Sequence, residues 1–415
     1  MLTNEERKIR IQKYAKLIAQ VGIKIIKGEE VWINAGLDQP DFVYMVVEEC
    51  YKAGAKHVEV VFSHMPMAKL STKYESISSL ARVSPYRKAK LKYQANKLPS
   101  IIYIDSDDPD GLKDINQVKM AKARQKSYPI IKPYRDKMED KYKWLIVGAP
   151  SKAWAEKVFP DLKGEEAINA LWDAILMTSR VDENDPVENW NKHNSTLHEK
   201  QKKLIDMDLR RLKYHASNGT DFEVELIPGT RWGSASETLK DGREYNPNIP
   251  TEEVFTSPYA GRCEGTLVAS KPLSYMGQLI EDFSITFKEG KVSEVHAKKN
   301  QALLEQMVNM DEGSKMLGEV ALVPFESPIN QSGILFYNTL YDENACCHVA
   351  LGEGFIMTLP QAADREVSPE EAHKLGINDS MIHVDFMVGT RDLSIVGIDK
   401  NGKEIQIFKD GTWAF

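Results

Sequence analysis

Long hydrophobic runs, a leader-like N-terminus and an excess of basic residues are all missing from this sequence of 415 residues. No run of 18 apolar residues occurs, so we expect no transmembrane helix and no membrane partner. The N-terminus has no apolar core before a small-residue cleavage site, so we expect no signal peptide and a cytoplasmic protein. The net charge of -7 lacks the basic footprint of nucleic-acid-binding proteins, so we expect no nucleic-acid partner.

Cysteine is scarce as well, with only four residues in the chain. A disulfide framework needs more cysteines than this, and neither Cys50 nor Cys263 forms a CxxC pair, so we expect reduced thiols with structural roles. What the chain does have is an ordinary globular composition, with 42% hydrophobic and 28% charged residues. Its length favours two or three domains.

The first half of the chain alternates between helical and strand patterns. Apolar residues recur at helical spacing over residues 5–26 and 42–53, and longer charged helical stretches cover 111–142 and 165–216. Short runs rich in apolar residues read as buried strands, at residues 31–35, 57–62, 101–104 and 144–148. A strand, a helix and a second strand in this order favour parallel pairing. We predict an α/β layered domain with parallel strands over residues 1–220.

The second half, residues 221–415, has the short alternating runs of an antiparallel domain. Four such runs come early in it, at residues 222–227, 266–269, 283–287 and 292–296. Glu289 and Gly290 lie between the last two as a hairpin turn. We predict an α+β domain with a barrel-like sheet that carries the chemistry. The first domain has no glycine-rich dinucleotide fingerprint, so we do not expect it to bind a nucleotide.

A histidine and an aspartate stand two residues apart in the apolar run at 381–388, MIHVDFMV. The run reads as a strand, in which positions i and i+2 point to the same face. His383 and Asp385 would therefore project together and could chelate a divalent metal. Such a pair is often incidental, so it does not predict a metal site alone.

Four further polar residues stand in apolar or extended surroundings. His348 follows two cysteines, and a lone buried histidine is usually a satisfied core residue. Glu319 begins an apolar strand, where a carboxylate is costly to bury unless it is paired or bound to metal. Glu252 and Glu253 lie in an extended segment between two prolines, which by itself reads as a solvated loop.

Taken together, these residues form a donor set for a dinuclear hydrolytic site. Such a site needs a bridging carboxylate, further carboxylates and a few imidazoles around two metals that share a water or hydroxide. Nitrogen and oxygen donors suit zinc, cobalt or manganese. The set comprises Glu253, Glu319, His348, His383 and Asp385. It does not identify a substrate.

Several segments, in order along the chain, resemble the M29, or thermophilic-metalloprotease, group of aminopeptidases. The resemblance spans nearly the whole chain. Its segments are residues 180–186, 248–258 (NIPTEEVFTSP), 265–273, 312–320 (EGSKMLGEV), 336–348 (FYNTLYDENACCH) and 382–389 (IHVDFMVG). So many matches in the same order are more specific than any one of them.

The resemblance implies a metal-dependent aminopeptidase that releases N-terminal residues from short peptides. The family's metal ligands fall on Glu253, Glu319, His348, His383 and Asp385. Glu319 would bridge two divalent ions (zinc, cobalt or manganese), with Glu253 and Asp385 on one ion and both histidines on the other. The chain would form a homodimer whose active sites face an enclosed cavity.

The catalytic candidates are Glu319 and Glu252. One metal would polarise the scissile carbonyl, and the pair of metals would lower the pKa of a bridging water. Because Glu319 cannot easily be both a tight bridge and a free base, we expect Glu252 to accept the proton.

The chain departs from the family at Phe355, where the family carries a tyrosine. A phenyl ring cannot donate a hydrogen bond to an oxyanion, and losing one such donor costs on the order of 10²–10³ in rate. Either Tyr337, Tyr341 or Tyr259 replaces it, or the chain is a catalytically weakened homologue that binds metal and peptides. An unrelated dinuclear hydrolase, such as a phosphoesterase, is a third alternative, but no phosphate-cradling glycine loop stands beside the ligands.

Overall fold

The computed structural model describes residues 2–113, 115–138 and 141–415. The chain divides into two compact units, Met1–Asn191 with Ser236–Ile249, and Lys192–Ala235 with Pro250–Phe415. The domain boundary that we predict near residue 220 stays a prediction, because compactness does not show which segment folds independently. Among the described residues, no helix has the length and apolar character needed to cross a membrane.

The first unit is built on a parallel sheet with the strand order β2-β1-β3-β4-β9. Its strands are β1 (Glu30–Gly36), β2 (His57–Ser63), β3 (Ser100–Asp105), β4 (Trp144–Gly148) and β9 (Asn248–Ile249). The sequence predicts the first four, and their parallel pairing is confirmed. Val31, Ile102 and Leu145 are buried, because helices cover the faces of a parallel sheet. A short ribbon of β7 (Glu237–Thr238) and β8 (Glu244–Tyr245) completes the strands of this unit.

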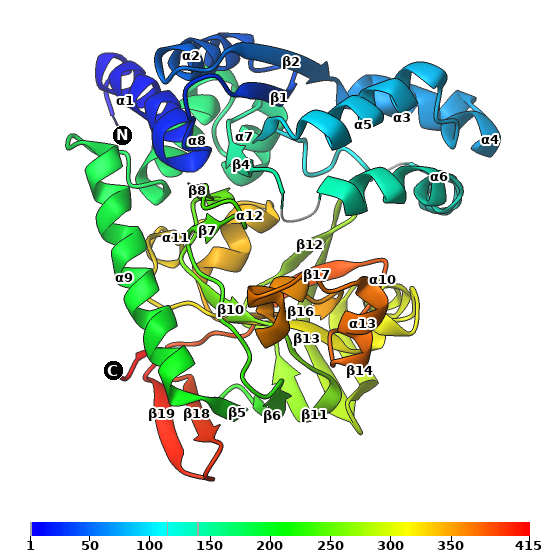
Figure 1. Cartoon of the computed structure of the whole chain (residues 1–415), viewed down its shortest axis with the longest axis vertical. Coiled ribbons are helices and arrows are strands. Elements are labelled where there is room, and N and C mark those ends of the chain that lie inside the picture. Colours follow the sequence, from blue (N-terminus) through cyan, green and yellow to red (C-terminus); the bar gives the residue numbers. More distant parts are fainter. Residues whose placement is uncertain (1, 114, 139–140) are drawn as a thin grey trace. The chain divides into compact units, whose positions relative to one another are not determined.

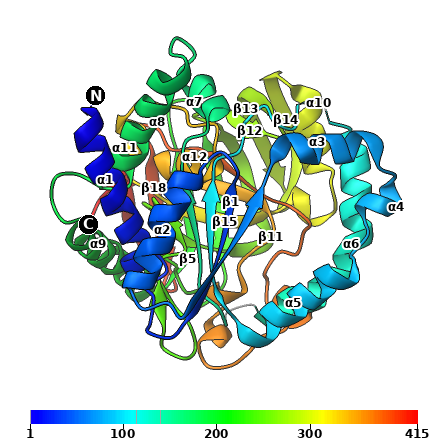
Figure 2. The same ribbon diagram turned by 90° about the horizontal axis from the view of Figure 1, so that it is seen from above.

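Aromatic side chains hold together the helices beside this sheet. Figure 2 shows α1 and α2 lying next to each other near β1. The Phe42 ring lies 5.7 Å from that of Tyr14 and 5.1 Å from that of Trp172, which joins three helices in one layer. The three helices of this layer are α1 (Asn4–Leu17), α2 (Pro40–Lys52) and α8 (Gly164–Thr178). A fourth helix, α7 (Lys152–Val158), packs against α8.

A second group of helices in this unit begins beside the sheet, where the Tyr93 ring stacks on that of Trp32 of β1 at 6.0 Å, and reaches out from it (Figures 1 and 2). It contains α3 (Met65–Tyr74), α4 (Ile77–Leu80), α5 (Pro85–Lys97) and α6 (Gln117–Met138). The helix that we predict over 111–142 begins at Gln117 and ends at Met138. Residues 114, 139 and 140 of that prediction lie outside the described residues.

The second unit contains a nine-stranded antiparallel sheet with the order β12-β13-β11-β6-β5-β18-β19-β20, and β14 pairs with β13. Its strands are β5 (Leu209–His215), β6 (Asp221–Leu226), β11 (Pro258–Val268), β12 (Leu273–Tyr275), β13 (Gln278–Lys288), β14 (Lys291–Lys299), β18 (Ser394–Asp399), β19 (Glu404–Lys409) and β20 (Thr412–Trp413). No closed sheet occurs among the described residues, so the predicted barrel is not confirmed. Glu289 and Gly290 both have positive φ and form the predicted hairpin turn between β13 and β14.

One predicted helix ends too late. The charged stretch over 165–216 contains α8 and α9 (Pro186–Met207), but its last residues form β5. Leu209, Leu212 and Tyr214 of β5 are buried, whereas the charged residues between them are not. The strand lies between β6 and β18 and is hydrogen-bonded on both sides, so sheet pairing overrides the helical preference of its charged residues.

A smaller sheet of four antiparallel strands lies against the large one. Its order is β10 (Val254–Thr256), β15 (Leu317–Leu322), β16 (His348–Gly352) and β17 (His383–Met387). Both sheets contribute to one hydrophobic core, in which Phe283 of β13 contacts Phe386 of β17 at a ring distance of 5.7 Å. All six residues of β15 are buried. Short helices connect these strands: α10 (Gln301–Val308), α11 (Pro328–Gln331), α12 (Thr339–Asp342) and α13 (Pro369–Lys374).

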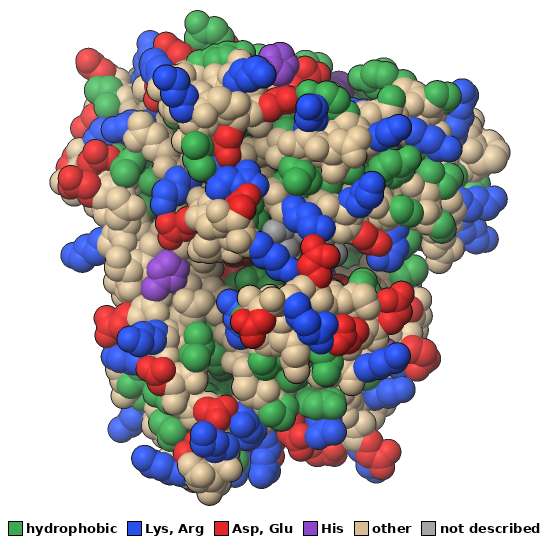
Figure 3. Space-filling model, viewed as in Figure 1, with side chains coloured by type: hydrophobic (Ala, Val, Ile, Leu, Met, Phe, Trp, Pro, Cys, Tyr) green, Lys and Arg blue, Asp and Glu red, His purple; other side chains and the backbone are tan. Residues whose placement is uncertain are grey.

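Acidic and basic side chains intermingle on the face of the molecule shown in Figure 3. Neither sign forms a continuous stripe over that face.

Candidate metal centre

The small sheet carries four of the five predicted ligands on one face. Glu319 lies on β15, His348 on β16, and His383 and Asp385 on β17. Ala350 is the register partner of both Glu319 and Asp385, so these three residues form one row across the sheet. Each histidine stands two residues from a member of this row, on its own strand. Strand side chains alternate between faces, so all four functional side chains emerge on the same side.

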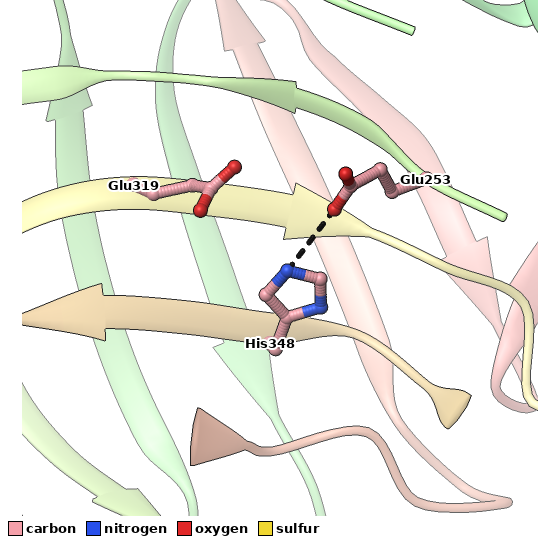
Figure 4. A group of neighbouring side chains, drawn as sticks. All are labelled: Glu253, Glu319 and His348. Atoms are coloured by element: carbon pink, nitrogen blue, oxygen red, sulfur yellow. Dashed lines mark ion pairs between the residues drawn. The ribbon is translucent and has the colours of Figure 1, made fainter. Parts of the chain in front are cut away.

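Glu253 reaches this group from the main chain just before β10. Its Oε2 lies 3.1 Å from Nε2 of His348. Figure 4 shows the side chains of Glu253, Glu319 and His348 converging from three different segments. The fifth predicted ligand therefore joins the other four although it lies outside the strands.

The candidate ligand atoms form two groups that share Glu319. One contains Glu253, Glu319 and His348, and the other Glu319, His383 and Asp385, with all ligand atoms of a group within 4.8 Å of one another. Nε2 of His383 lies 3.2 Å from Oε2 of Glu319 and 3.4 Å from Oδ1 of Asp385. Each group holds one imidazole and one further carboxylate besides Glu319. The partition expected from the resemblance is different, with both histidines on one ion and Glu253 and Asp385 on the other. A carboxylate shared by two groups is what a dinuclear centre requires.

Main-chain carbonyl groups orient both imidazoles. Nδ1 of His348 lies 3.3 Å from the carbonyl oxygen of Cys346, and Nδ1 of His383 lies 2.7 Å from that of Glu353. A carbonyl oxygen only accepts, so each Nδ1 carries the proton and donates it. The Nε2 atoms then face the carboxylates, which is the orientation found in metal-binding histidines.

Burial and mutual repulsion perturb the pKa of these groups. Burial raises the pKa of Glu319 to about 7, and the charges of Asp385 and Glu253 act in the same direction. Burial alone would also raise the pKa of Asp385, but His383 beside it lowers that pKa to about 2. Burial disfavours the charged form of His348, yet Glu253 raises its pKa well above the usual range. Positive charge is therefore strongly favoured at this cluster.

The residues fit a divalent metal. Oδ1 of Asp385 is buried and, among the described residues, has no hydrogen-bond partner. A buried carboxylate oxygen is costly unless a donor or a cation reaches it. The nitrogen and oxygen donors match those preferred by zinc, cobalt and manganese.

Glu343 is a neighbour that sequence reasoning missed. It lies on the short turn Glu343–Ala345 that leads into β16. Burial, followed by the negative charges of Asp385 and Glu253, raises the pKa of its carboxyl well above the usual range. With Asp385 it lines a small cavity, together with Leu273, Ser274, Thr339, Asp342 and Met387. No local sequence pattern marks Glu343 as part of the site, because the turn that carries it is only three residues long.

Glu252 lies beside the cluster but in neither ligand group. Neighbouring side chains of an extended segment point apart, and Oε2 of Glu252 lies 3.9 Å from Nε2 of His193 on α9. Residues 250–258 are all buried, so the interpretation of this segment as a solvated loop is wrong.

Phe355 forms an aromatic wall at the cluster. Its ring lies 5.0 Å from that of His383 and 5.3 Å from that of Phe255. Of the tyrosines considered as replacements, Tyr341 stacks on a phenylalanine and Tyr259 packs under an arginine. The group in contact with His383 at this position is a phenyl ring without a hydroxyl.

Comparisons with known proteins identify the family of this chain. The sequence pattern of the family described as thermophilic metalloprotease (M29) matches residues 7–413. The chain is 39% identical over 407 residues to aminopeptidase AmpS of Bacillus subtilis and 38% identical over 406 residues to aminopeptidase 2 of Geobacillus stearothermophilus. Each alignment covers 98% of both sequences.

The fold is also similar to a solved structure, wild-type AmpT from Thermus thermophilus. The TM-score is 0.90 at 32% sequence identity, and the match covers 98% of this chain and 100% of that one. Sequence and structure agree over nearly the full length, so this chain belongs to the M29 family of thermophilic metalloproteases.

Proposed function

We propose that this chain is a metal-dependent aminopeptidase that removes N-terminal residues from short peptides. The observation that carries the proposal is the pair of buried ligand groups that share Glu319. Relatives named aminopeptidases support the same activity. They do not favour the alternative of a weakened homologue that only binds metal and peptides.

In this proposal, Glu253, Glu319, His348, His383 and Asp385 hold two divalent ions, which are zinc, cobalt or manganese. Bound ions of this kind supply Lewis acidity and make water in the site more acidic. The chain contributes a fixed geometry, because carbonyl groups hold both imidazoles and three of the strands hold four of the ligands. The ring of Phe355 packs against those of His383 and Phe255 beside the cluster.

Two carboxylates are the catalytic candidates in this proposal. Glu319 lies between the two ligand groups, where it orients the reacting atoms. Glu252 accepts the proton, and Nε2 of His193 lies 3.9 Å from its Oε2. A homodimer and a cytoplasmic location remain predictions from the sequence.

Replacing the shared carboxylate tests the activity. Purified protein with added zinc or cobalt should hydrolyse Leu-p-nitroanilide but not its N-acetylated form, because an aminopeptidase needs a free α-amino group. The Glu319→Gln variant should lose at least about 100-fold in rate, because the amide keeps only one of the two carboxylate oxygens and cannot serve both ligand groups. Glu294→Gln, an exposed change on β14, is the matched control. Full activity of Glu319→Gln with metal bound, or equal cleavage of the acetylated substrate, would contradict the proposal.

A further inference from the structure

Glu253 differs from the other four proposed ligands because no strand holds it. It lies in the segment 250–253, between β9 and β10, and Thr251, Glu252 and Glu253 are all buried. Main-chain groups in a buried segment must find hydrogen-bond partners, and here sheet pairing does not supply them. The direction of the Glu253 side chain therefore depends on whatever binds this segment.

Asn344 binds the segment from one side. Its Oδ1 accepts the main-chain N–H of Glu252 at 2.8 Å, and its Nδ2 donates to the carbonyl oxygen of Leu340 at 3.0 Å. Oε1 of Glu343 lies 3.4 Å from the same Nδ2. Asn344 is fully buried. Its amide thus joins the segment that carries Glu253 to the turn that leads into β16.

His193 binds the segment from the other side. Its Nε2 lies 2.8 Å from the carbonyl oxygen of Thr251, and it must be the donor because a carbonyl only accepts. The C=O of Thr251 and the N–H of Glu252 belong to one peptide group, which is planar and rigid. Both polar atoms of this peptide group are therefore held by side chains, and its plane is fixed. The next residue along the chain is Glu253.

We propose that Asn344 is a positioning residue, which together with His193 fixes the peptide group between residues 251 and 252 and thereby aims Glu253 at His348. The proposal rests on the metal site proposed above. Strand pairing holds Glu319, His383 and Asp385 independently of this contact. Loss of Asn344 should therefore weaken the ligand group that contains Glu253 and leave the other group intact.

An asparagine suits this position because it accepts and donates at once. An ionised aspartate would keep the acceptor for the N–H of Glu252, but it would lose the donor to Leu340 and place another negative charge beside Glu343. A leucine of similar size would lose both bonds. These two changes separate the contribution of the acceptor from that of the donor.

The test is zinc binding to metal-free protein, measured by competition with a chromophoric chelator. Wild-type protein should bind two zinc ions. Asn344→Leu should bind one of them at least about 10-fold more weakly, with the second within about twofold, since loss of a residue that orients a ligand costs 10–100-fold in metal affinity. Asn344→Asp should lose less than Asn344→Leu. His193→Leu should give the same selective loss, and it tests the proposal if Asn344→Leu does not fold.

Two controls separate positioning from general damage. In the same unit, the main-chain N–H of Val268 donates to the hydroxyl oxygen of the fully buried Thr220. Thr220→Val removes this bond, which is of the same type, and should leave zinc binding unchanged. In a Glu253→Gln background the ligand group is already broken, so Asn344→Leu should weaken zinc binding no further.

Unchanged zinc binding in both Asn344→Leu and His193→Leu overturns the proposal. An equal loss of zinc affinity on Asn344→Leu in the wild-type and Glu253→Gln backgrounds also overturns the proposal. Wild-type protein that binds no zinc, cobalt or manganese contradicts the proposed metal site itself, and the two failures are thereby distinguished.

Discussion

At the scale of single residues, this chain has Phe355 at the position where its resemblance to the family implies a tyrosine. The ring fits the site because it packs against both Phe255 and His383. Packing of this kind orients the imidazole, and a phenyl ring does it as well as a phenol. What the phenyl ring lacks is a donor for negative charge that develops on the substrate.

Restoring the hydroxyl should therefore raise the rate. In Phe355→Tyr we expect kcat to rise by about 10-fold or more while KM changes little, because a donor that acts on developing charge stabilises the transition state more than the bound substrate. Steady-state kinetics on Leu-p-nitroanilide at matched metal content measure both constants. Phe62→Tyr, on exposed β2, is the control. An unchanged kcat would mean that another group already supplies the donor.

At the scale of elements, the strand that carries His383 and Asp385 was readable from its sequence. An apolar run with two polar residues at i and i+2 predicts a shared face, and β17 has that form. The register that sets Asp385 level with Ala350 and Glu319 was not readable. It depends on long connections between the strands, which no local pattern encodes.

The same limit explains what the sequence left out. Glu343 lies on a single helical turn, too short to have a periodic pattern, and its proximity to the cluster comes from tertiary packing. The segment that carries Glu252 and Glu253 is hydrogen-bonded by His193 and Asn344, which are remote in sequence. For β5, local charge suggested a helix, whereas pairing on both sides made it a strand.

Close contact between two elements makes Gly233 a sensitive position. Gly233 exchanges main-chain hydrogen bonds with Phe255, and a Cβ placed at Gly233 would lie 2.4 Å from Cζ of the Phe255 ring. Gly233→Ala should therefore lower the free energy of unfolding by roughly 1–3 kcal/mol, because the ring must leave its packed position. Urea unfolding of metal-free protein measures the change.

A second substitution checks the cause. Phe255→Leu removes the ring atoms that meet the new methyl group, so Gly233→Ala should cost less in that background than alone. Equal costs in the two backgrounds would show that the ring is not the source of the strain.

At the scale of the whole molecule, the cluster concentrates buried negative charge in one small sheet. Metals that bind the folded state and not the unfolded one stabilise it in proportion to the logarithm of their concentration. Stripping them with EDTA should lower the unfolding temperature of the wild-type protein by several degrees. Calorimetry with and without chelator measures the shift, and Glu319→Gln should show little of it. A wild-type unfolding temperature that is the same with and without EDTA would argue against a stabilising metal.

The order of the strands along the chain also determines when the cluster can exist. Glu253 lies before β10, whereas His383 and Asp385 lie on β17, close to the C-terminus. At usual rates of protein synthesis, on the order of ten seconds separate the emergence of the first donor from that of the last. Until β17 has been synthesised, a nascent chain lacks two of the five proposed donors. A complete donor set for the proposed metal site can therefore form only after that strand has emerged.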